Sequence, residues 1–152
     1  MNYQTHCQWM EQAIAVAAEA GEAGEVPVGA VVVDAQGQCV AIASNRRQRD
    51  YDPTAHAEVL ALRRAGHQLQ TWHLNQCTLY VTLEPCPMCA GALLQARLGL
   101  VVYGADDPKT GALRTALNLP DSPGSTHRLP AIGGILESTC RQQLQNWFRS
   151  RR

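Results

Sequence analysis

Two short clusters carry the residue types that bind metals and move protons. His56 and Glu58 are separated by one alanine, and Cys86 and Cys89 are separated by two residues, after Pro85. Cysteines three positions apart on a helix lie about 5–6 Å apart on one side, so both sulfurs can reach one ion. A helix N-terminus favours the thiolate form. Because two thiolates and a neutral imidazole suit zinc, the sequence predicts one zinc ion bound by His56, Cys86 and Cys89.

The number of available ligands distinguishes a catalytic from a structural zinc site. A structural site fills all four positions with protein atoms, whereas a catalytic site keeps one position for water. The chain has no second Cys-x-x-Cys pair and no His-x-x-x-His pair that could close the site. Three ligands plus water are therefore expected, and such a water ionises near neutral pH.

Glu58 is predicted to be a carboxylate that moves protons and does not bind the metal. Residues two apart on a helix point to opposite sides, so His56 and Glu58 can cooperate only if the site lies beyond the helix end. The alternative for Glu58 is a solvated acid in the first turn, favoured by the helix dipole. A redox role for the Cys-x-x-Cys pair would leave the nearby His-x-Glu unexplained and lacks a thioredoxin-like context.

Strands alternate with helices along the chain. β-Branched and apolar runs bounded by turn residues predict strands at 28–33, 39–43, 78–83 and 100–103. Apolar periodicity and end signals predict helices at 9–20, 52–64, 87–97 and 136–148, with a polar loop at about 121–128. This alternation favours a layered α/β sheet with its ligand site at the strand ends.

Length and composition fit a single soluble domain. The 152 residues predict one domain over 1–152, and 45% hydrophobic with 17% charged residues is typical of a globular chain. Thirteen basic and thirteen acidic residues cancel, which excludes a strongly basic nucleic-acid coat protein but not a local basic patch. No apolar stretch approaches the ~18 residues of a membrane helix. No leader is evident at the N-terminus, so a cytoplasmic protein with reduced thiols is expected.

Several longer segments carry a family resemblance. They are EVPVGAV at 25–31, DPTAHAE at 52–58, TLYVTLEPC at 78–86, MCAGA at 88–92 and KTGA at 109–112. With the pattern H-x-E followed by P-C-x-x-C, the chain resembles the zinc-dependent nucleobase deaminases over nearly its whole length. Among them, the resemblance is to the bacterial members that act on adenosine in tRNA.

The resemblance implies a fold, a reaction and site residues. The fold is a cytidine-deaminase-like, three-layer α/β/α arrangement with a five-stranded mixed sheet flanked by helices, assembled as a homodimer. The reaction is hydrolytic deamination of the wobble adenosine in a tRNA anticodon loop to inosine, with release of ammonia. His56, Cys86 and Cys89 match the zinc ligands, and Glu58 matches the proton shuttle.

Four further residues are expected to contact the substrate. By the resemblance, Asn45 hydrogen-bonds the flipped nucleoside; its alternative role is that of a plain turn asparagine. Met88, Val28 and Ala57 are expected to line an apolar pocket for the base, although such residues more often pack in a core.

Two rival functions share parts of this pattern. One is a deaminase of a free base or nucleoside, which the metal motif alone would permit. The other is a zinc-stabilised RNA-binding module without catalysis, which requires a fourth protein ligand, and no residue has suitable spacing for one.

Basic residues gather at the C-terminal end of the chain. Residues 1–45 contain five acids and no lysine or arginine, whereas residues 138–152 contain four arginines and no acid. We expect Arg149, Arg151 and Arg152 to contact RNA, together with His127, which precedes Arg128 in the polar loop. The alternative is a helix end where arginines suit the negative end of the dipole.

We predict that changing Arg149, Arg151 and Arg152 together to alanine weakens tRNA binding and flattens its salt dependence. The reason is that binding releases fewer counterions from the RNA when phosphate contacts are lost. The single-turnover rate at saturation should change little, because these side chains are distant from the metal ligands. Binding titrations at several salt concentrations test this, and unchanged affinity and slope would identify the tail as a helix end only.

Overall fold

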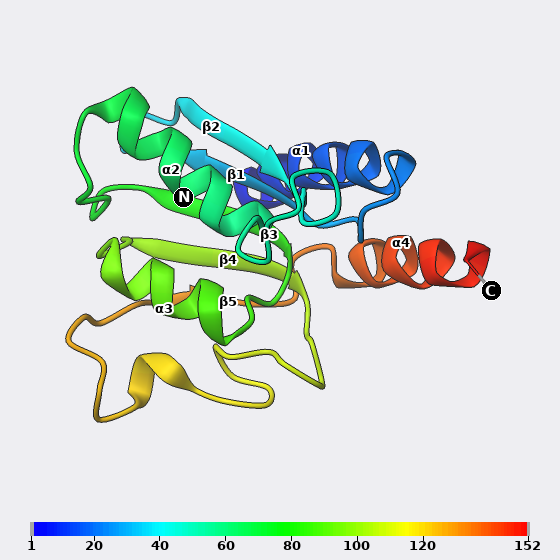
Figure 1. Cartoon of the computed structure of the whole chain (residues 1–152). Coiled ribbons are helices and arrows are strands. Elements are labelled where there is room, and N and C mark those ends of the chain that lie inside the picture. Colours follow the sequence, from blue (N-terminus) through cyan, green and yellow to red (C-terminus); the bar gives the residue numbers. More distant parts are fainter. Residues whose placement is uncertain (1, 152) are drawn as a thin grey trace.

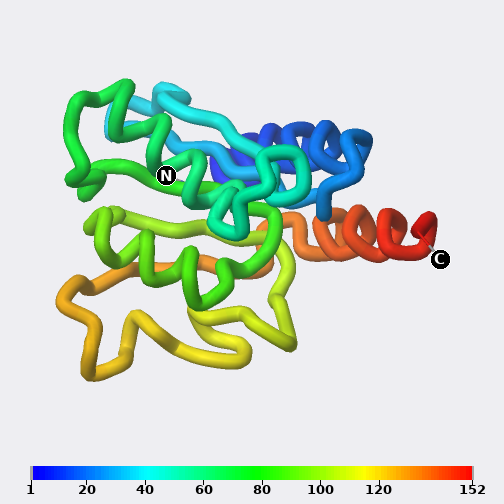
Figure 2. Tube along the Cα trace, viewed as in Figure 1, coloured from blue at the N-terminus to red at the C-terminus, as the bar shows by residue number. Residues whose placement is uncertain are grey.

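The computed structural model describes residues 2–151 as three layers, with a five-stranded sheet between two pairs of helices (Figure 1). The tube view traces the same path from the N-terminal helix behind the sheet to the C-terminal helix (Figure 2). The predicted three-layer α/β/α fold is confirmed. No helix within this part of the chain is long and apolar enough to cross a membrane. The helices are α1 (Tyr3–Glu22), α2 (Ala57–Leu69), α3 (Pro87–Gln95) and α4 (Glu137–Ser150), with a short 3-10 helix at Leu119–Asp121.

The sheet is mixed and has the strand order β2-β1-β3-β4-β5. Strand β1 pairs antiparallel with both β2 and β3, whereas β3–β4 and β4–β5 are parallel pairs. Parallel neighbours need a crossover connection, and α3 supplies the one between β3 and β4. The strands are β1 (Gly29–Val33), β2 (Cys39–Ser44), β3 (Thr78–Leu83), β4 (Leu100–Ala105) and β5 (Ala131–Ile132).

Strand β1 lies in the centre of the core and is buried along its whole length. Ala30 and Val32 pack into the cluster under α2 and α3, whereas Val31 and Val33 pack into the cluster under α1 and α4. Gly29 is needed where α1 crosses this strand, because a Cβ there would lie 2.1 Å from the Ala13 carbonyl oxygen. The close approach fixes α1 directly against the strand that leads into the site.

The predicted start of the second helix at residue 52 is wrong, because Asp52 forms a turn instead. Its Oδ1 accepts hydrogen bonds from the Thr54 backbone N–H at 2.8 Å and from Thr54 Oγ1 at 2.7 Å. The Ala55 N–H then donates to the Asp52 carbonyl. Asp-Pro-Thr is a signal for both a helix start and a turn. Helix α2 begins at Ala57 and runs past Gly66 to Leu69, so His56 is its extended N-cap residue.

The remaining element boundaries differ from the predictions by a few residues, apart from two larger differences. Helix α1 starts at Tyr3, six residues earlier than the apolar periodicity indicates, because the Asn2 side chain caps it by accepting from the Thr5 N–H. Strand β5 was not predicted. It has two residues, too few for any alternation to appear in the sequence, and only its pairing with β4 defines it.

Candidate active site

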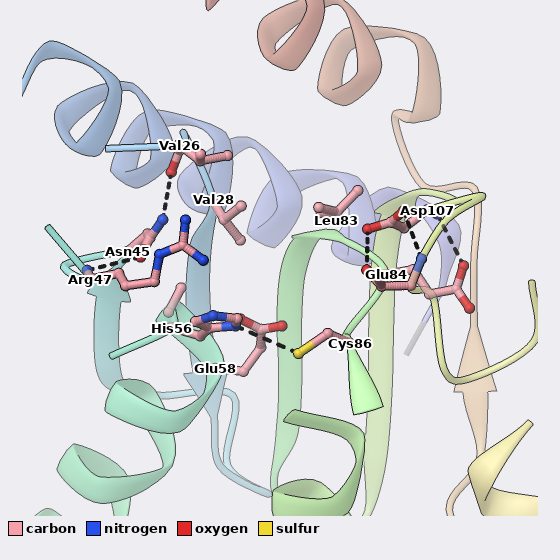
Figure 3. Close-up of a pocket in the computed structure, with 12 residues that line it drawn as sticks. Val26, Val28, Asn45, Arg47, His56, Glu58, Leu83, Glu84, Cys86 and Asp107 are labelled. Atoms are coloured by element: carbon pink, nitrogen blue, oxygen red, sulfur yellow. Dashed lines mark hydrogen bonds between the residues drawn. The ribbon is translucent and has the colours of Figure 1, made fainter. Parts of the chain in front are cut away.

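The three predicted metal ligands come together in one group. Figure 3 shows two of them, His56 and Cys86, side by side. His56 is the residue immediately before α2, and Cys86 holds the same N-cap position on α3, with Cys89 one turn further on. His56 Nδ1 lies 3.6 Å from Cys86 Sγ and 3.5 Å from Cys89 Sγ. Two neighbouring helix starts therefore place one nitrogen and two sulfurs around a common point.

This arrangement fits a tetrahedral zinc ion. With zinc–nitrogen and zinc–sulfur bonds of about 2.0 and 2.3 Å at tetrahedral angles, a nitrogen and a sulfur ligand lie about 3.5 Å apart. The two observed nitrogen–sulfur separations match that value. No fourth His, Cys, Asp or Glu of residues 2–151 joins the group, so a fourth coordination position is left for a small ligand.

The two thiols have opposite acidities because they share a proton. The pKa of Cys86 is lowered to about 4, chiefly because its sulfur accepts a hydrogen bond from Cys89 and a further one from His56. The pKa of Cys89 is raised, because its thiol is the donor in that bond and because it is buried. The lowered pKa favours the thiolate form of Cys86, the form that binds zinc.

Glu58 lies beside the three ligands although it is not one of them. Its carboxylate is 4% exposed, and burial raises its pKa to about 7. In Figure 3 the Glu58 side chain extends toward the space between His56 and Cys86. The two side chains converge because His56 precedes the first helical turn, so the two-residue spacing does not send them to opposite sides. The site thus lies beyond the N-terminal end of the helix, as a site shared by His56 and Glu58 requires.

The predicted substrate-binding residues line a pocket above this group. Val28, Ala57 and Asn45 all border it, together with His56 and Glu58. The expectation for Met88 is wrong, because this side chain is exposed and is not among the residues that line the pocket. Asn45 Nδ2 donates to the Val26 carbonyl at 3.2 Å, and its Oδ1 accepts from the Arg47 backbone N–H at 3.1 Å. The amide is therefore held in place and still has one free N–H and one free lone pair.

Glu84 is a central residue of the site that the sequence reasoning missed. It is 1% exposed and borders the same pocket. Its carboxylate accepts five hydrogen bonds, which outweigh the cost of burial and lower its pKa. It thereby holds the loop after β4 against the pocket, where Asp107 lies on the side opposite Asn45 (Figure 3). Thr110 of the same loop also lines the pocket. The donors are the backbone N–H groups of Asp107, Leu113, Arg114 and Thr115 and the Thr115 hydroxyl.

Glu25 plays the same part for the loop between β2 and α2. This carboxylate is also 1% exposed. It accepts from the backbone N–H groups of Gln48 at 2.9 Å and Arg49 at 2.8 Å, and from Arg49 Nε at 3.2 Å. Burial would raise the pKa of Glu25, but these hydrogen bonds lower it overall. EVPVGAV and TLEPC contain these two glutamates, but their distant partners are visible only in the fold.

The structure assigns protein partners to two of the four expected RNA-contacting side chains. His127 Nε2 lies 2.7 Å from the Leu98 carbonyl oxygen, to which it donates. The Arg151 guanidinium stacks on Trp147 and donates to the Gly21 carbonyl at 3.2 Å. Arg149 is exposed, and Arg152 lies outside the described residues. RNA contact by these residues stays a prediction.

Comparison with known proteins agrees with this geometry. The model of the MafB19-like deaminase family matches residues 4–151. The tRNA-specific adenosine deaminase of Bacillus subtilis is 45% identical over 144 residues, covering 95% of this chain and 89% of that protein. That of Haemophilus influenzae is 43% identical over 143 residues, covering 94% and 83%. A solved structure from a study of tRNA:A34 deaminases superposes with a TM-score of 0.87 at 40% identity, covering 90% and 98%.

A three-layer fold with a His/Cys/Cys group and a buried glutamate at its strand ends defines the class of nucleobase deaminases. The identities place the chain more closely within that class. It belongs to the family of the tRNA-specific adenosine deaminases.

Removal of one sulfur ligand tests the metal group. We predict that Cys86→Ala lowers zinc affinity by more than ~10–100-fold. That is the loss expected when a residue that hydrogen-bonds to a metal ligand is removed, and Cys86 is itself a ligand. Elemental analysis of the purified protein should show far less than one zinc per chain. Cys39→Ala is the matched control, because Cys39 is an exposed thiol on β2. Stoichiometric zinc in Cys86→Ala would contradict the ligand assignment.

The lowered pKa of Glu25 predicts a pH-dependent stability. Because its folded pKa lies below the ordinary value of 4.5, its stabilisation is complete above that value and is lost as the pH falls through the folded pKa. Glu25→Gln should cost about 1–3 kcal/mol of unfolding free energy at pH 7 and reduce the loss between pH 5 and pH 3. Denaturant unfolding measures both, with Glu11→Gln as an exposed control on α1. An unchanged pH profile in Glu25→Gln would refute the role.

Proposed function

We propose that this chain catalyses hydrolytic deamination of the wobble adenosine in a tRNA anticodon loop, producing inosine and ammonia. The observation that carries the proposal is the buried Glu58 carboxylate beside the His/Cys/Cys group, at the base of a pocket with apolar and amide walls. The names of the family members supply the substrate class. The geometry supplies the chemistry.

His56 Nδ1, Cys86 Sγ and Cys89 Sγ would hold one zinc ion per chain. A zinc ion bound there acts as a Lewis acid and lowers the pKa of a water toward neutrality, which makes that water a nucleophile. His56, Glu58 and Cys86 all line the pocket, so a base that enters it would lie beside this group. His56 and the two cysteines would bind the metal, and another residue would transfer the protons.

Glu58 is the group positioned to move those protons. Its carboxylate would accept a proton from the water that attacks C6 of adenine and would deliver that proton to ring N1. It would then carry the remaining hydroxyl proton to the exocyclic amine. The C6–N bond would break, with loss of ammonia and formation of the C6 carbonyl of inosine. A pKa near neutrality allows a carboxyl group to accept and release protons in turn.

The pocket walls would hold the base in the attacking orientation. Chemistry on a base requires it to leave the stack and enter such a pocket. Val28 and Ala57 provide apolar surface for the ring. Asn45 offers its free N–H and lone pair to the nucleoside, and its two existing hydrogen bonds fix the plane of the amide.

We also propose a homodimer formed through the outer face of α2 and α3. A groove between these helices is lined by apolar side chains from both. Trp72, one of the residues that line it, is 70% exposed. Exposed apolar patches of this kind mark interaction sites, and α2 and α3 form the outer layer on their side of the sheet (Figure 1). The residues include Val59, Leu62, Leu74, Ala92 and Ala96.

A cytoplasmic location follows from the same proposal. It places the protein with its tRNA substrate and in a compartment that keeps the two ligand thiols reduced. We propose a single deaminase domain over residues 1–152, since no linker divides the helices and strands that build the site.

The test of this function compares substrates directly. The zinc-loaded protein should convert adenosine to inosine in an anticodon stem-loop, and a chelator should abolish the reaction. Adenosine, guanine and cytidine are supplied separately, and ammonia release is measured. Rapid turnover of a free base without activity on the stem-loop would identify the free-base alternative. Binding of the stem-loop without turnover would identify an RNA-binding module.

We predict that Glu58→Gln retains zinc and the fold but loses turnover by at least ~10²–10⁴-fold. The amide keeps the shape of the side chain and removes the group that moves protons. Zinc content, circular dichroism and single-turnover inosine formation measure the three properties. Activity close to that of the unmodified chain would exclude Glu58 as the proton shuttle.

A further inference from the structure

Arg47 is a basic side chain on the pocket wall that no other residue of the described chain neutralises. The loop after β2 carries three arginines, at positions 46, 47 and 49. Arg46 pairs with Asp50 at 3.0 Å, and Arg49 pairs with Glu25 at 3.2 Å. Arg47 has no ion pair and no side-chain hydrogen bond within residues 2–151, and it lines the pocket. Figure 3 shows its guanidinium extending over His56 toward Val28.

The backbone of Arg47 is fixed although its side chain is free. Its N–H donates to Asn45 Oδ1 at 3.1 Å, and its carbonyl accepts from the Asp52 N–H at 3.1 Å. The next two residues are clamped by the Glu25 carboxylate. The side chain therefore projects from a rigid segment, and little backbone ordering remains when it binds a ligand.

The charges of the pocket explain why a free cation is needed there. Glu58, Glu84, Cys86 and Asp107 all border the pocket. A zinc ion bound by both cysteines would offset their two thiolates but not the carboxylates of Glu84 and Asp107. A nucleotide strand entering this opening brings further negative charge, which these groups repel. Arg47 is the one lysine or arginine among the described lining residues.

We propose that Arg47 binds the phosphodiester group next to the flipped adenosine, on its 5′ or 3′ side. This inference rests on the proposed function and names a contact for its substrate. The guanidinium presents paired N–H donors that match two phosphate oxygens. The contact gives the pocket a preference for a nucleotide within a strand over a free base or nucleoside, which has no phosphodiester.

The test compares two adjacent arginines. Arg47→Ala should raise the half-saturating stem-loop concentration in single-turnover deamination by about 10- to 100-fold, the value of a charge-assisted hydrogen bond. It should lower the slope of log affinity against log salt by about 0.7–0.9. The maximal rate should change little. Arg46→Ala is the matched control, because its guanidinium is paired with Asp50 outside the pocket.

Neutral linkages identify the phosphate. Two stem-loops carry an uncharged methylphosphonate, one on the 5′ side and one on the 3′ side of the target adenosine. The stem-loop modified at the contacted phosphate should bind the unmodified protein as weakly as the natural stem-loop binds Arg47→Ala. In Arg47→Ala that linkage should cause no further loss, whereas in Arg46→Ala its effect should be additive. Arg47→Lys should recover part of the affinity that Arg47→Ala loses, because a phosphate also accepts a point charge although the paired donors are gone.

The inference would be overturned if each methylphosphonate weakened binding to Arg47→Ala as much as it weakens binding to the unmodified protein. Binding by Arg47→Lys as weak as that by Arg47→Ala would also overturn it and would indicate stacking of the guanidinium on a base instead. If the unmodified protein deaminates the stem-loop and Arg47→Ala matches Arg46→Ala, only this inference fails. If the unmodified protein has no activity on the stem-loop, the proposed function fails as well.

Discussion

The meeting of His56 with Cys86 and Cys89 depends on two helices that begin side by side at one edge of the sheet. His56 and Cys86 occupy equivalent N-cap positions, on α2 and α3, with extended backbones before the first helical turn. From there a side chain can point along the helix axis, out of the helix end, and a residue in the first turn can point the same way. The sheet sets the distance between the two helix starts, so strand pairing determines whether the three ligand atoms meet.

Two buried carboxylates fix the loops that complete the site. Glu25 and Glu84 are each 1% exposed, and burial of such charges is costly unless they are paired or hydrogen-bonded. Both carboxylates meet that condition, because they accept hydrogen bonds from backbone N–H groups of the loop beside them. Glu25 holds the segment that carries Asn45 and Arg47, and Glu84 holds the segment that carries Asp107. The two pocket walls are thus attached to the sheet by charge-assisted hydrogen bonds.

The features that the sequence predicts well are those set by local spacing. The His-x-Glu and Cys-x-x-Cys motifs, the strand at β3 and the helix at α3 depend on residues near one another in the chain. The start of α2 was wrong because Asp52 and Pro53 give the same signal for a turn and for a helix. The role of Glu84 was missed because its partners lie 23 to 31 residues further on and meet it only through the pairing of β3 with β4.

The use of backbone donors has an evolutionary consequence. Six of the eight hydrogen bonds accepted by Glu25 and Glu84 come from main-chain N–H groups, and the other two come from the side chains of Arg49 and Thr115. Any residue except proline supplies a main-chain N–H. An exposed side chain such as that of Gln48 can therefore change while the loop keeps its course. A fold built in this way can exchange the residues that face its substrate and acquire new specificities around an unaltered reaction centre.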